Sequence, residues 1–567
     1  MKKTSSRIVV LLLFTFHFQV FTFTCIAQTS NWLWVTGGCG AEDYGNSISL
    51  DSNGNCYVTG YFKPPFIYLG NDTLTGSTSY NFRFYIVKYD NSGNELWAKT
   101  VGGNCNSWGT GIKTDAHGNC YVTGYFDNSA IIIFGSDTLS SAGSSGPLNF
   151  FIAKYDSLGN VLWAKTANGT INQSMGNGPS INIDVNGNVY VTGTFGNNPI
   201  INTITFSNVI LTGFGKSDIF IVKYDSSGNV LWAKCVGGSN NDFGTGISLD
   251  ANGNSYITGY FGSTTLAFDS ITVTNNSNGN SIIFVAKYDS LGNVIWAKSS
   301  GTYSCLKPSI SIDANGNSYI TGFFNTNYAV FGNITLTNVC DESIFIVKFD
   351  SLGNVVWAKS AGGVSTDSDE AHSIITDAKG NSYVTGFFQG MLTFGNTAVL
   401  TSTGSLDIFV AKYDSSGNVL WVQKAGGDDN DVGNGISIDA NGNSYITGYC
   451  YSSYAIFGNS GWANCGNTNN SIVFVAKLKN VTIGITEVNN LANKVNVFPN
   501  PTNGCFILSV PPETKEIHIL NSLGQIMENV TVDNQTILNF EIIKSGIYFI
   551  QIITDKETAI KKLIVVD

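Results

Sequence analysis

The sequence predicts an all-β fold, and three observations point to it. Aromatic residues make up 13% of the chain, and β-branched residues are also abundant. Charged residues make up only 12%, about half of the usual share, while 63 glycines are spread along the chain. After the first thirty residues, apolar residues alternate or run in short stretches between turn residues, without helical periodicity. At 567 residues the chain is too long for one ordinary core, so several domains or a repeat array are expected.

The first residues have the layout of a secretory signal peptide. Basic residues come first, an apolar stretch runs from Ile8 to Ile26, and a small residue, Ala27, precedes Gln28. We expect residues 1–27 to be removed by cleavage between Ala27 and Gln28. An uncleaved membrane anchor is the alternative, because the stretch is nearly long enough to span a bilayer. Polar residues inside it favour cleavage, and no integral membrane segment is expected after processing.

One motif, Asp-x-x-Gly-Asn followed by an apolar strand, recurs along most of the chain. It begins at Asp51, Asp115, Asp184, Asp250, Asp313, Asp377 and Asp439, with spacings of 62 to 69 residues. A second signature, typified by IFIVKYDSSGNVLWAK at 219–234, repeats its Lys in all seven copies and its Trp in six. A fixed period of this kind indicates a repeat architecture.

Each copy is predicted to hold four strands, which in the fourth copy are 246–250, 255–261, 282–289 and 293–298, with a short ribbon at 268–273. The seventh copy lacks its last strand, whereas NWLWVTGG near the N-terminus matches the end of a repeat. One strand from the start therefore completes the last copy, which suits a closed ring. Residues 28–479 are predicted to form a seven-bladed β-propeller closed by the N-terminal strand.

The repeated D-x-x-G-N-x-Y-V/I-T-G-Y/F strings resemble a bacterial β-propeller repeat that is widespread in exported proteins. The resemblance implies the fold but not an activity, because propellers carry many unrelated functions.

A different segment follows residues 480–494, which read as a polar linker. Residues 495–567 show alternating apolar strands cut by turns, which predicts a small Ig-like β-sandwich. Its motifs resemble the C-terminal sorting domain of the type IX secretion system of Bacteroidota. The matching residues are Pro499, Asn500, Pro501, Gly504, Gly524, Gly546 and Tyr548. The resemblance implies the type IX machinery as partner and a secreted or outer cell-surface location, reached through the periplasm; an ordinary adhesion module is the alternative.

The Asp-x-x-Gly-Asn motif has two physical interpretations. A calcium loop of the EF-hand type needs a Glu twelve positions after its start, but the twelfth residue from Asp250 is Phe261. A hairpin turn needs only the Asp, the Asn and a left-handed Gly. The turn is therefore favoured, and no metal or other cofactor is expected.

Candidate ligand contacts lie where the repeats differ. Trp108 and Trp462 lie outside the repeated Trp position, and they are predicted to make ligand contacts. Asp242 and Asp431, like Asp43 and Asp369, precede the first strand of a copy, so these acids are expected to gather on one rim. Three nearby cysteine pairs are open to disulfide formation: Cys39 with Cys56, Cys105 with Cys120, and Cys450 with Cys465.

The composition also bears on function. The chain is acidic, with a formal net charge of −11, and lacks the basic stripe of a nucleic-acid binder. No catalytic histidine arrangement, phosphate loop or cofactor fingerprint is found, so no catalytic residue is assigned. The sequence favours an exported binding or scaffold module for a glycan or protein ligand. The alternative is a polysaccharide lyase or glycoside hydrolase that uses acidic rim residues.

Overall fold

The structure is a computed structural model that describes residues 31–566 apart from short gaps. The gaps are 80, 128–129, 141–147, 170–177, 197–201, 278–279, 301–304, 339, 364–366, 396–397, 464–469, 481–494, 501, 522–524, 534, 543 and 555–557. The described residues form β-strands and turns without any helix, so the all-β fold class is confirmed. The chain divides into two compact parts, Met1–Asn480 and Val481–Asp567. The predicted signal peptide lies outside the described residues.

Seven four-stranded antiparallel repeat units follow one another in the N-terminal part, and we name their strands inner, second, third and outer in pairing order. The inner strands are β2 (Asp43–Leu50), β9 (Ser107–Thr114), β16 (Ser180–Ile183), β22 (Asp242–Leu249), β28 (Cys305–Ile312), β34 (Glu370–Thr376) and β38 (Asp431–Ile438). The second strands are β3 (Cys56–Phe62), β10 (Cys120–Asp127), β17 (Val189–Gly196), β23 (Ser255–Phe261), β29 (Ser318–Phe324), β35 (Ser382–Phe394) and β39 (Ser444–Cys450). The third strands are β6 (Arg83–Tyr89), β13 (Leu148–Tyr155), β20 (Ser217–Tyr224), β26 (Ile282–Tyr288), β32 (Ser343–Phe349), β36 (Ala398–Tyr413) and β42 (Ile472–Leu478). The outer strands are β7 (Glu95–Thr100), β14 (Val161–Thr166), β21 (Val230–Val236), β27 (Val294–Ser300), β33 (Val355–Gly362), β37 (Val419–Ala425) and β1 (Trp32–Cys39).

A short two-stranded ribbon joins the second and third strands in every unit except the sixth, where β35 and β36 themselves run on and pair. The ribbons are β4 (Phe66–Leu69) with β5 (Asp72–Thr75), β11 (Ile131–Phe134) with β12 (Asp137–Ser140), β18 (Thr203–Phe206) with β19 (Val209–Thr212), β24 (Thr265–Phe268) with β25 (Ile271–Thr274), β30 (Tyr328–Phe331) with β31 (Ile334–Thr337), and β40 (Tyr454–Phe457) with β41 (Ser460–Ala463). Two-residue strands, β8 (Gly102–Gly103) and β15 (Asn168–Gly169), extend the ribbons of units two and three.

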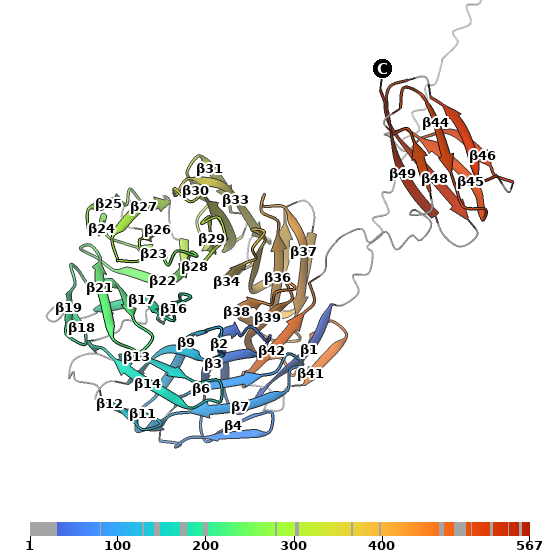
Figure 1. Ribbon diagram of the computed structural model, residues 1–567. Helices are drawn as coiled ribbons and strands as arrows, with labels where there is room; N and C mark the ends of the chain where they lie inside the picture. The colour runs from blue at the N-terminus through green and yellow to red at the C-terminus, as the bar shows by residue number, and fades with distance from the viewer. Residues whose placement is uncertain are drawn as a thin grey trace, which may run out of the picture. The chain divides into compact units, whose positions relative to one another are not determined.

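The seven inner strands make a closed ring. Each contacts the inner strand of the next unit, and β38 of the seventh unit returns to β2 of the first. Figure 1 shows the sheets of the N-terminal part arranged around a common centre. The seam is closed by β1, which pairs antiparallel with β42 and aligns Trp34 with Lys477 and Gly37 with Phe474. Strand β1 thus supplies the fourth strand of the last repeat unit.

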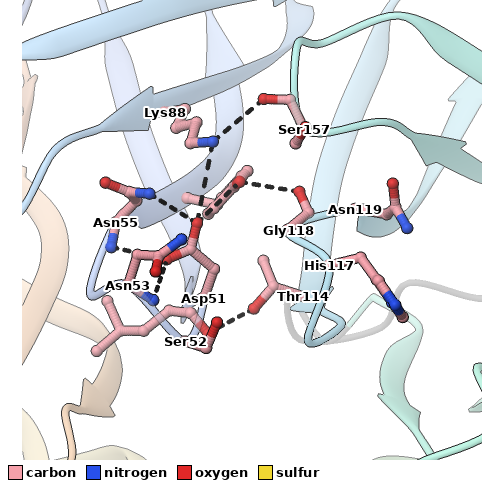
Figure 2. A network of polar contacts seen from close by, with 12 residues as sticks. Asp51, Ser52, Asn53, Asn55, Lys88, Thr114, His117, Gly118, Asn119 and Ser157 are labelled. Atoms are coloured by element: carbon pink, nitrogen blue, oxygen red, sulfur yellow. Dashed lines mark hydrogen bonds and ion pairs between the residues drawn. The ribbon is translucent and has the colours of Figure 1, made fainter.

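The Asp-x-x-Gly-Asn motif forms the turn between the inner and second strands (Figure 2). Asp51 Oδ1 accepts hydrogen bonds from the backbone amides of Asn53 at 3.0 Å and Asn55 at 2.9 Å. Asp51 Oδ2 accepts a bond from Asn55 Nδ2 at 2.8 Å. Gly54 takes the left-handed conformation, with φ of 78°, that the turn requires. The carboxylate is thus occupied by the donors of its own turn.

The same turn connects neighbouring units. In Figure 2, Lys88 approaches Asp51 Oδ2 at 3.9 Å and donates a hydrogen bond to the Ser157 carbonyl of the next unit at 3.1 Å. The Lys88 ammonium also lies 4.8 Å from the centre of the Tyr57 ring, and the Tyr57 hydroxyl donates to the Gly118 carbonyl. Every unit repeats this Lys-over-Tyr contact, at 4.6 to 5.0 Å. The recurring Lys is therefore explained by contacts at the seams between units.

The proposed disulfides involving Cys56, Cys105, Cys120 and Cys450 are wrong, because all four residues are free and buried. Cys56 and Cys120 begin second strands at a position that holds Ser in four other units, so their side chains fill the sheet interior. Cys39 is in a disulfide bond, and Cys465 lies outside the described residues.

Two antiparallel sheets share one hydrophobic core in the C-terminal part. One sheet consists of β43 (Asn496–Phe498), β44 (Cys505–Ser509) and β47 (Ile537–Glu541), and the other of β46 (Ile526–Thr531), β45 (Thr514–Leu520), β48 (Gly546–Thr554) and β49 (Thr558–Val565). Asn500 ties its loop to β49, since its side chain donates to the Lys562 carbonyl at 2.7 Å and accepts from the Ile564 amide at 2.9 Å. The Tyr548 hydroxyl donates to the Lys544 carbonyl at 2.9 Å. These motif residues stabilise the C-terminal part; Pro501 and Gly524 lie outside the described residues.

Candidate binding site at the central channel

A central channel runs along the inner strands of the ring. Its cavity has a volume of about 460 Å³, and residues of all seven inner strands line it. Tyr61, Tyr125 and Tyr449 of the second strands line it at the level where the inner strands begin. We call this end of the channel its mouth.

One position of each unit, the fifth residue before the turn Asp, lines the channel; it lies within the inner strand in six units and directly before β16 in the third. The seven residues at this position are Asn46, Thr110, Pro179, Thr245, Pro308, His372 and Asn434. Several of them bond to the adjacent unit: Asn46 Nδ2 donates to the Gly109 carbonyl at 2.8 Å, and Asn434 Nδ2 donates to the Gly45 carbonyl at 2.9 Å. These bonds hold neighbouring inner strands at a fixed distance. Because the residue at this position differs between units, the polar groups along the channel wall also differ from unit to unit.

An aromatic arc surrounds part of the mouth, over units seven, one and two. Its members are Tyr44, Tyr61, Phe82, Trp108, Tyr125, Tyr449 and Tyr451, of which all but the buried Tyr125 are half-buried. The rings form a continuous series. Tyr44 stacks on Tyr61 with centroids 4.8 Å apart, and Trp108 lies 5.0 Å from Tyr125. Phe82 connects the two pairs, at 5.1 Å from Tyr61 and 6.0 Å from Trp108.

An ionic cluster lies at the mouth in units five and six. Glu370 Oε2 accepts from Lys307 Nζ at 3.1 Å and contacts His372 Nε2 at 3.0 Å, and His372 Nδ1 contacts Asn434 Oδ1 at 3.1 Å. Burial alone would raise the pKa of Glu370, but the hydrogen bonds and charges of His372 and Lys307 outweigh it and lower that pKa. The cluster therefore presents an ionised Glu370 carboxylate held in place by two neighbouring side chains.

Lys307 also has a strained backbone. Its φ of 48° lies in the left-handed region, which costs a residue with a side chain on the order of 1 kcal/mol. Five of the other units have Gly at this position, at Gly45, Gly109, Gly178, Gly244 and Gly433. A charged side chain thus enters the ring where the repeat otherwise has none.

The residues predicted as ligand contacts are separated in the structure. Trp108 belongs to the aromatic arc, whereas Trp462 lies on ribbon strand β41 beside Gly37 of β1. Asp242 and Asp431 are fully buried, and each accepts a hydrogen bond from a serine hydroxyl, of Ser263 and Ser452 respectively. Asp43 and Asp369 are fully buried as well, so these acids do not form the exposed rim that was expected.

Burial alters the acidity of these groups. Burial raises the pKa of Asp242 and of Asp431 to about 6, although hydrogen bonds from serine and backbone donors oppose the shift. Burial likewise raises the pKa of Asp369 to about 7. These carboxyl groups are enclosed by the fold and are not free to contact a ligand.

Sequence reasoning missed most of the channel residues. Tyr61, Tyr125 and Tyr449 belong to the repeated strand motif, so nothing in the sequence sets them apart. Lys307 and His372 did carry a signal, because they replace the Gly and the Asn, Thr or Pro of other copies. Among the residues that the structure describes, no group of three or more His, Cys, Asp or Glu is placed to hold a metal ion.

Comparisons with known proteins identify parts of the chain. Residues 496–566 match the secretion system C-terminal sorting domain, and residues 36–61, 231–260 and 420–454 match the β-propeller repeat. The chain thus carries a type IX sorting domain and β-propeller repeats.

Two curated relatives are similar over part of their length. An uncharacterized WD repeat-containing protein of Acanthamoeba polyphaga mimivirus is 25% identical over 442 residues, which cover 64% of this chain and 32% of that protein. The regulatory protein FlaEY of Caulobacter vibrioides is 27% identical over 380 residues, covering 63% of this chain and 38% of that protein. The chain therefore spans about a third of the length of these relatives.

Solved structures are similar only at low scores. A protein of unknown function from Dyadobacter fermentans has a TM-score of 0.31 and 8% identity, with 68% of this chain and 98% of that one covered. An apocarotenoid oxygenase from Synechocystis has a TM-score of 0.32 and 10% identity, with 71% and 95% covered. Neither likeness bears on function.

Proposed function

We propose that this protein is an exported binding protein built as a seven-bladed β-propeller, with its ligand site at the channel mouth. The seven repeat units would be the blades, residues 28–479 the propeller, 480–494 a linker and 495–567 an Ig-like sorting domain. The closed ring of inner strands and the pairing of the N-terminal strand β1 with β42 of the last unit support seven blades. The division of the chain after Asn480 supports the boundary between the propeller and the linker.

The aromatic arc carries the proposal. A sugar ring has apolar C–H faces that pack against aromatic side chains, while its hydroxyls need hydrogen-bonding partners. The arc supplies half-buried rings next to the ionic cluster of Lys307, Glu370 and His372, around a cavity of about 460 Å³. A few convergent polar groups beside aromatic walls are typical of a binding pocket. A surface glycan is therefore the proposed ligand, and no cofactor is included.

Export rests on the sorting domain. A type IX sorting domain directs its protein to secretion and implies an interaction with the secretion machinery. The proposed route runs from a cleaved signal peptide through the periplasm to the medium or the outer cell surface. The described residues include no helix that is long and apolar enough to cross a bilayer.

The alternative function, a polysaccharide lyase or hydrolase, relied on Asp242 and Asp431 as rim acids. Because both side chains are fully buried, neither can reach a polysaccharide without local opening of its unit. No described feature favours this chemistry over binding.

Glycan-array binding of the processed full chain tests the proposal. Trp108→Ala should lower the affinity for any bound glycan at least tenfold, because it removes one ring of the arc. Trp462→Ala is the matched control, since Trp462 is also a half-buried Trp but lies on ribbon strand β41. Equal affinities of the two variants, with circular dichroism unchanged, would contradict the proposed site.

A further inference from the structure

The channel lining has a charge opposite to that of the whole protein. The chain has a formal net charge of −11. The described residues that line the channel nevertheless include Lys113, Lys307 and His372 but no Asp or Glu. An acidic protein that keeps carboxylates out of its central cavity provides a local environment that favours an anion.

Lys113 differs from the other buried lysines of the ring. Lysines of the third strands have carbonyl or carboxylate partners at the seams, and Lys307 pairs with Glu370. No hydrogen bond or ion pair joins the Lys113 ammonium to any described residue. Burial lowers the pKa of Lys113, with no opposing charge nearby to offset the effect. A half-buried cation that lines a cavity without a partner carries an uncompensated desolvation free energy, which a bound anion would offset.

Its position in the repeat is also exceptional. Lys113 is the second residue before the turn Asp, a position that holds Ser49, Ser248, Ser311 and Ser437 in four other units. A serine at this position bonds across a seam, as Ser49 does with the Thr114 hydroxyl at 2.9 Å. The fold therefore accepts Ser here and does not require the lysine.

Two further donors lie at the same level of the channel. Asn182 and Ser248 occupy the same position in the next two inner strands and line the same cavity. The Oδ1 atom of Asn182 accepts from the Ile183 amide at 2.9 Å, which leaves the side-chain NH₂ group as the donor. An ammonium, an amide and a hydroxyl on three consecutive strands form a set of donors suited to oxygens of an anion.

We propose that the channel binds an oxyanion group, a carboxylate or a sulfate, with Lys113 as its ion partner and Asn182 and Ser248 as hydrogen-bond donors. The group would be either a free anion or the charged substituent of a saccharide that enters from the mouth. Lys113 lies five residues along the strand from the level of Trp108, or about 16 Å. Acidic saccharides would then be the preferred ligands, a step that rests on the proposed function.

Calorimetric titration of the processed full chain with sulfate, glucuronate and neutral glucose tests the site. Sulfate and glucuronate should bind more tightly than glucose, and Lys113→Ser should weaken both at least tenfold. Lys298→Ser, which removes an exposed lysine from an outer strand, is the matched control and should change neither affinity. Lys113→Gln is a second variant that removes the charge while keeping a long side chain, should the serine variant fail to fold.

The outcomes separate the two claims. Binding of sulfate alone identifies a free-anion site, and tighter binding of glucuronate identifies a saccharide site. Trp108→Ala should leave sulfate binding unchanged, so failure of the glycan proposal would not remove the anion site. If neither anion bound, or if the Lys113 variants bound both as the unaltered protein does, the anion site would be wrong.

Discussion

Asp242, Asp369 and Asp431 occupy the same position of the repeat, at or directly before the start of the inner strand, in units four, six and seven. Each carboxyl group is fully buried, and each has a raised pKa, about 6 for Asp242 and Asp431 and about 7 for Asp369. The turn aspartates are more exposed and bond to their own turns, as Asp250 does. Within one repeat, Asp therefore has two roles: a fully buried carboxyl with a raised pKa, and a more exposed carboxylate that stabilises a turn.

The buried acids predict a pH dependence of stability. Between pH 4 and 7 the folded chain keeps protons that the unfolded chain has lost, so the stabilising contribution of these groups should fall as the pH rises from 4 through 7. Ionisation of the three sites together should lower the free energy of unfolding by about 2 to 5 kcal/mol between pH 5 and 8. Urea unfolding followed by tryptophan fluorescence at both pH values measures this difference.

Asp369→Asn isolates one site in that experiment. The amide cannot ionise, so the variant should lose most of the decline that continues above pH 6, where Asp242 and Asp431 have largely ionised. Asp428→Asn is the control, because Asp428 is fully exposed and its pKa is lowered by hydrogen bonds from Ser453. Stability that rose between pH 5 and 8 would show that these carboxyl groups are ionised in the folded chain.

At the scale of the element, a turn whose Asp pairs with a lysine can be compared with a turn whose Asp bonds only to its own turn. Asp250 and Asp289 make nearly identical hydrogen bonds to their own turns, at 2.8 to 3.0 Å. Asp250 also pairs with Lys287 at 3.4 Å, and both side chains are largely buried. Asp250→Ala should thus lower the free energy of unfolding by about 3 kcal/mol, because it leaves the buried Lys287 ammonium without its ion partner. Asp289→Ala should lower the free energy of unfolding by about 1 kcal/mol, and equal urea midpoints for the two variants would contradict the role given to the Asp250–Lys287 pair.

Strand β1 gives a second prediction at this scale. Trp32 is buried and packs edge-on against Phe457 at 5.1 Å, and β1 covers the free edge of β42. Deleting residues 28–39 should expose that edge and cause association, since unpaired edges recruit other strands. Light scattering should show oligomers, and adding a peptide of residues 28–39 should restore the monomer where a scrambled peptide does not. A monomer that unfolds at the unaltered midpoint would contradict closure through β1.

The strands of the repeat could be predicted closely from sequence. In the fourth unit the predicted strands 255–261 and 282–289 correspond to Ser255–Phe261 and Ile282–Tyr288, because seven copies of one pattern define the same boundaries. The inner strand was predicted too short, at 246–250 against Asp242–Leu249. Its first residues, Asp242 to Gly244, contain a Gly and an Asp typical of turns, yet they pair with the second strand, and a bulge at Thr245 separates them from the predicted segment.

The candidate site could be predicted only in part. Trp108 was found because it departs from the repeat, and Lys113 departs from it as well, but its unpartnered state depends on the inner strands of neighbouring units. The acids of the supposed rim were misplaced because Asp43, Asp242 and Asp431 are already the first residues of inner strands and are fully buried there. Which residues of different units lie close together depends on how the ring closes. The pattern of strands in the sequence does not specify those contacts.

At the scale of the whole molecule, the chain pairs a ring with a separately folded sorting domain. The C-terminal part has its own core, in which Phe506, Ile517 and Ile550 are buried. Its motif residue Asn500 bonds within that part, to Lys562 and Ile564. Removing the C-terminal part should therefore leave the ring folded and alter only where the protein is delivered.

Deleting residues 495–567 should trap the protein in the periplasm of a host that has the type IX machinery, because the remaining ring lacks the segment that the machinery recognises. Protease accessibility on intact cells and immunoblots of periplasm and medium measure the location. Asn500→Ala should reduce export partially, since it loosens β49 without removing the domain. Trp108→Ala, which alters only the channel mouth, should be exported normally. Unchanged surface display after the deletion would mean that another part of the chain directs export, and the sorting role would then have to be assigned within the ring itself.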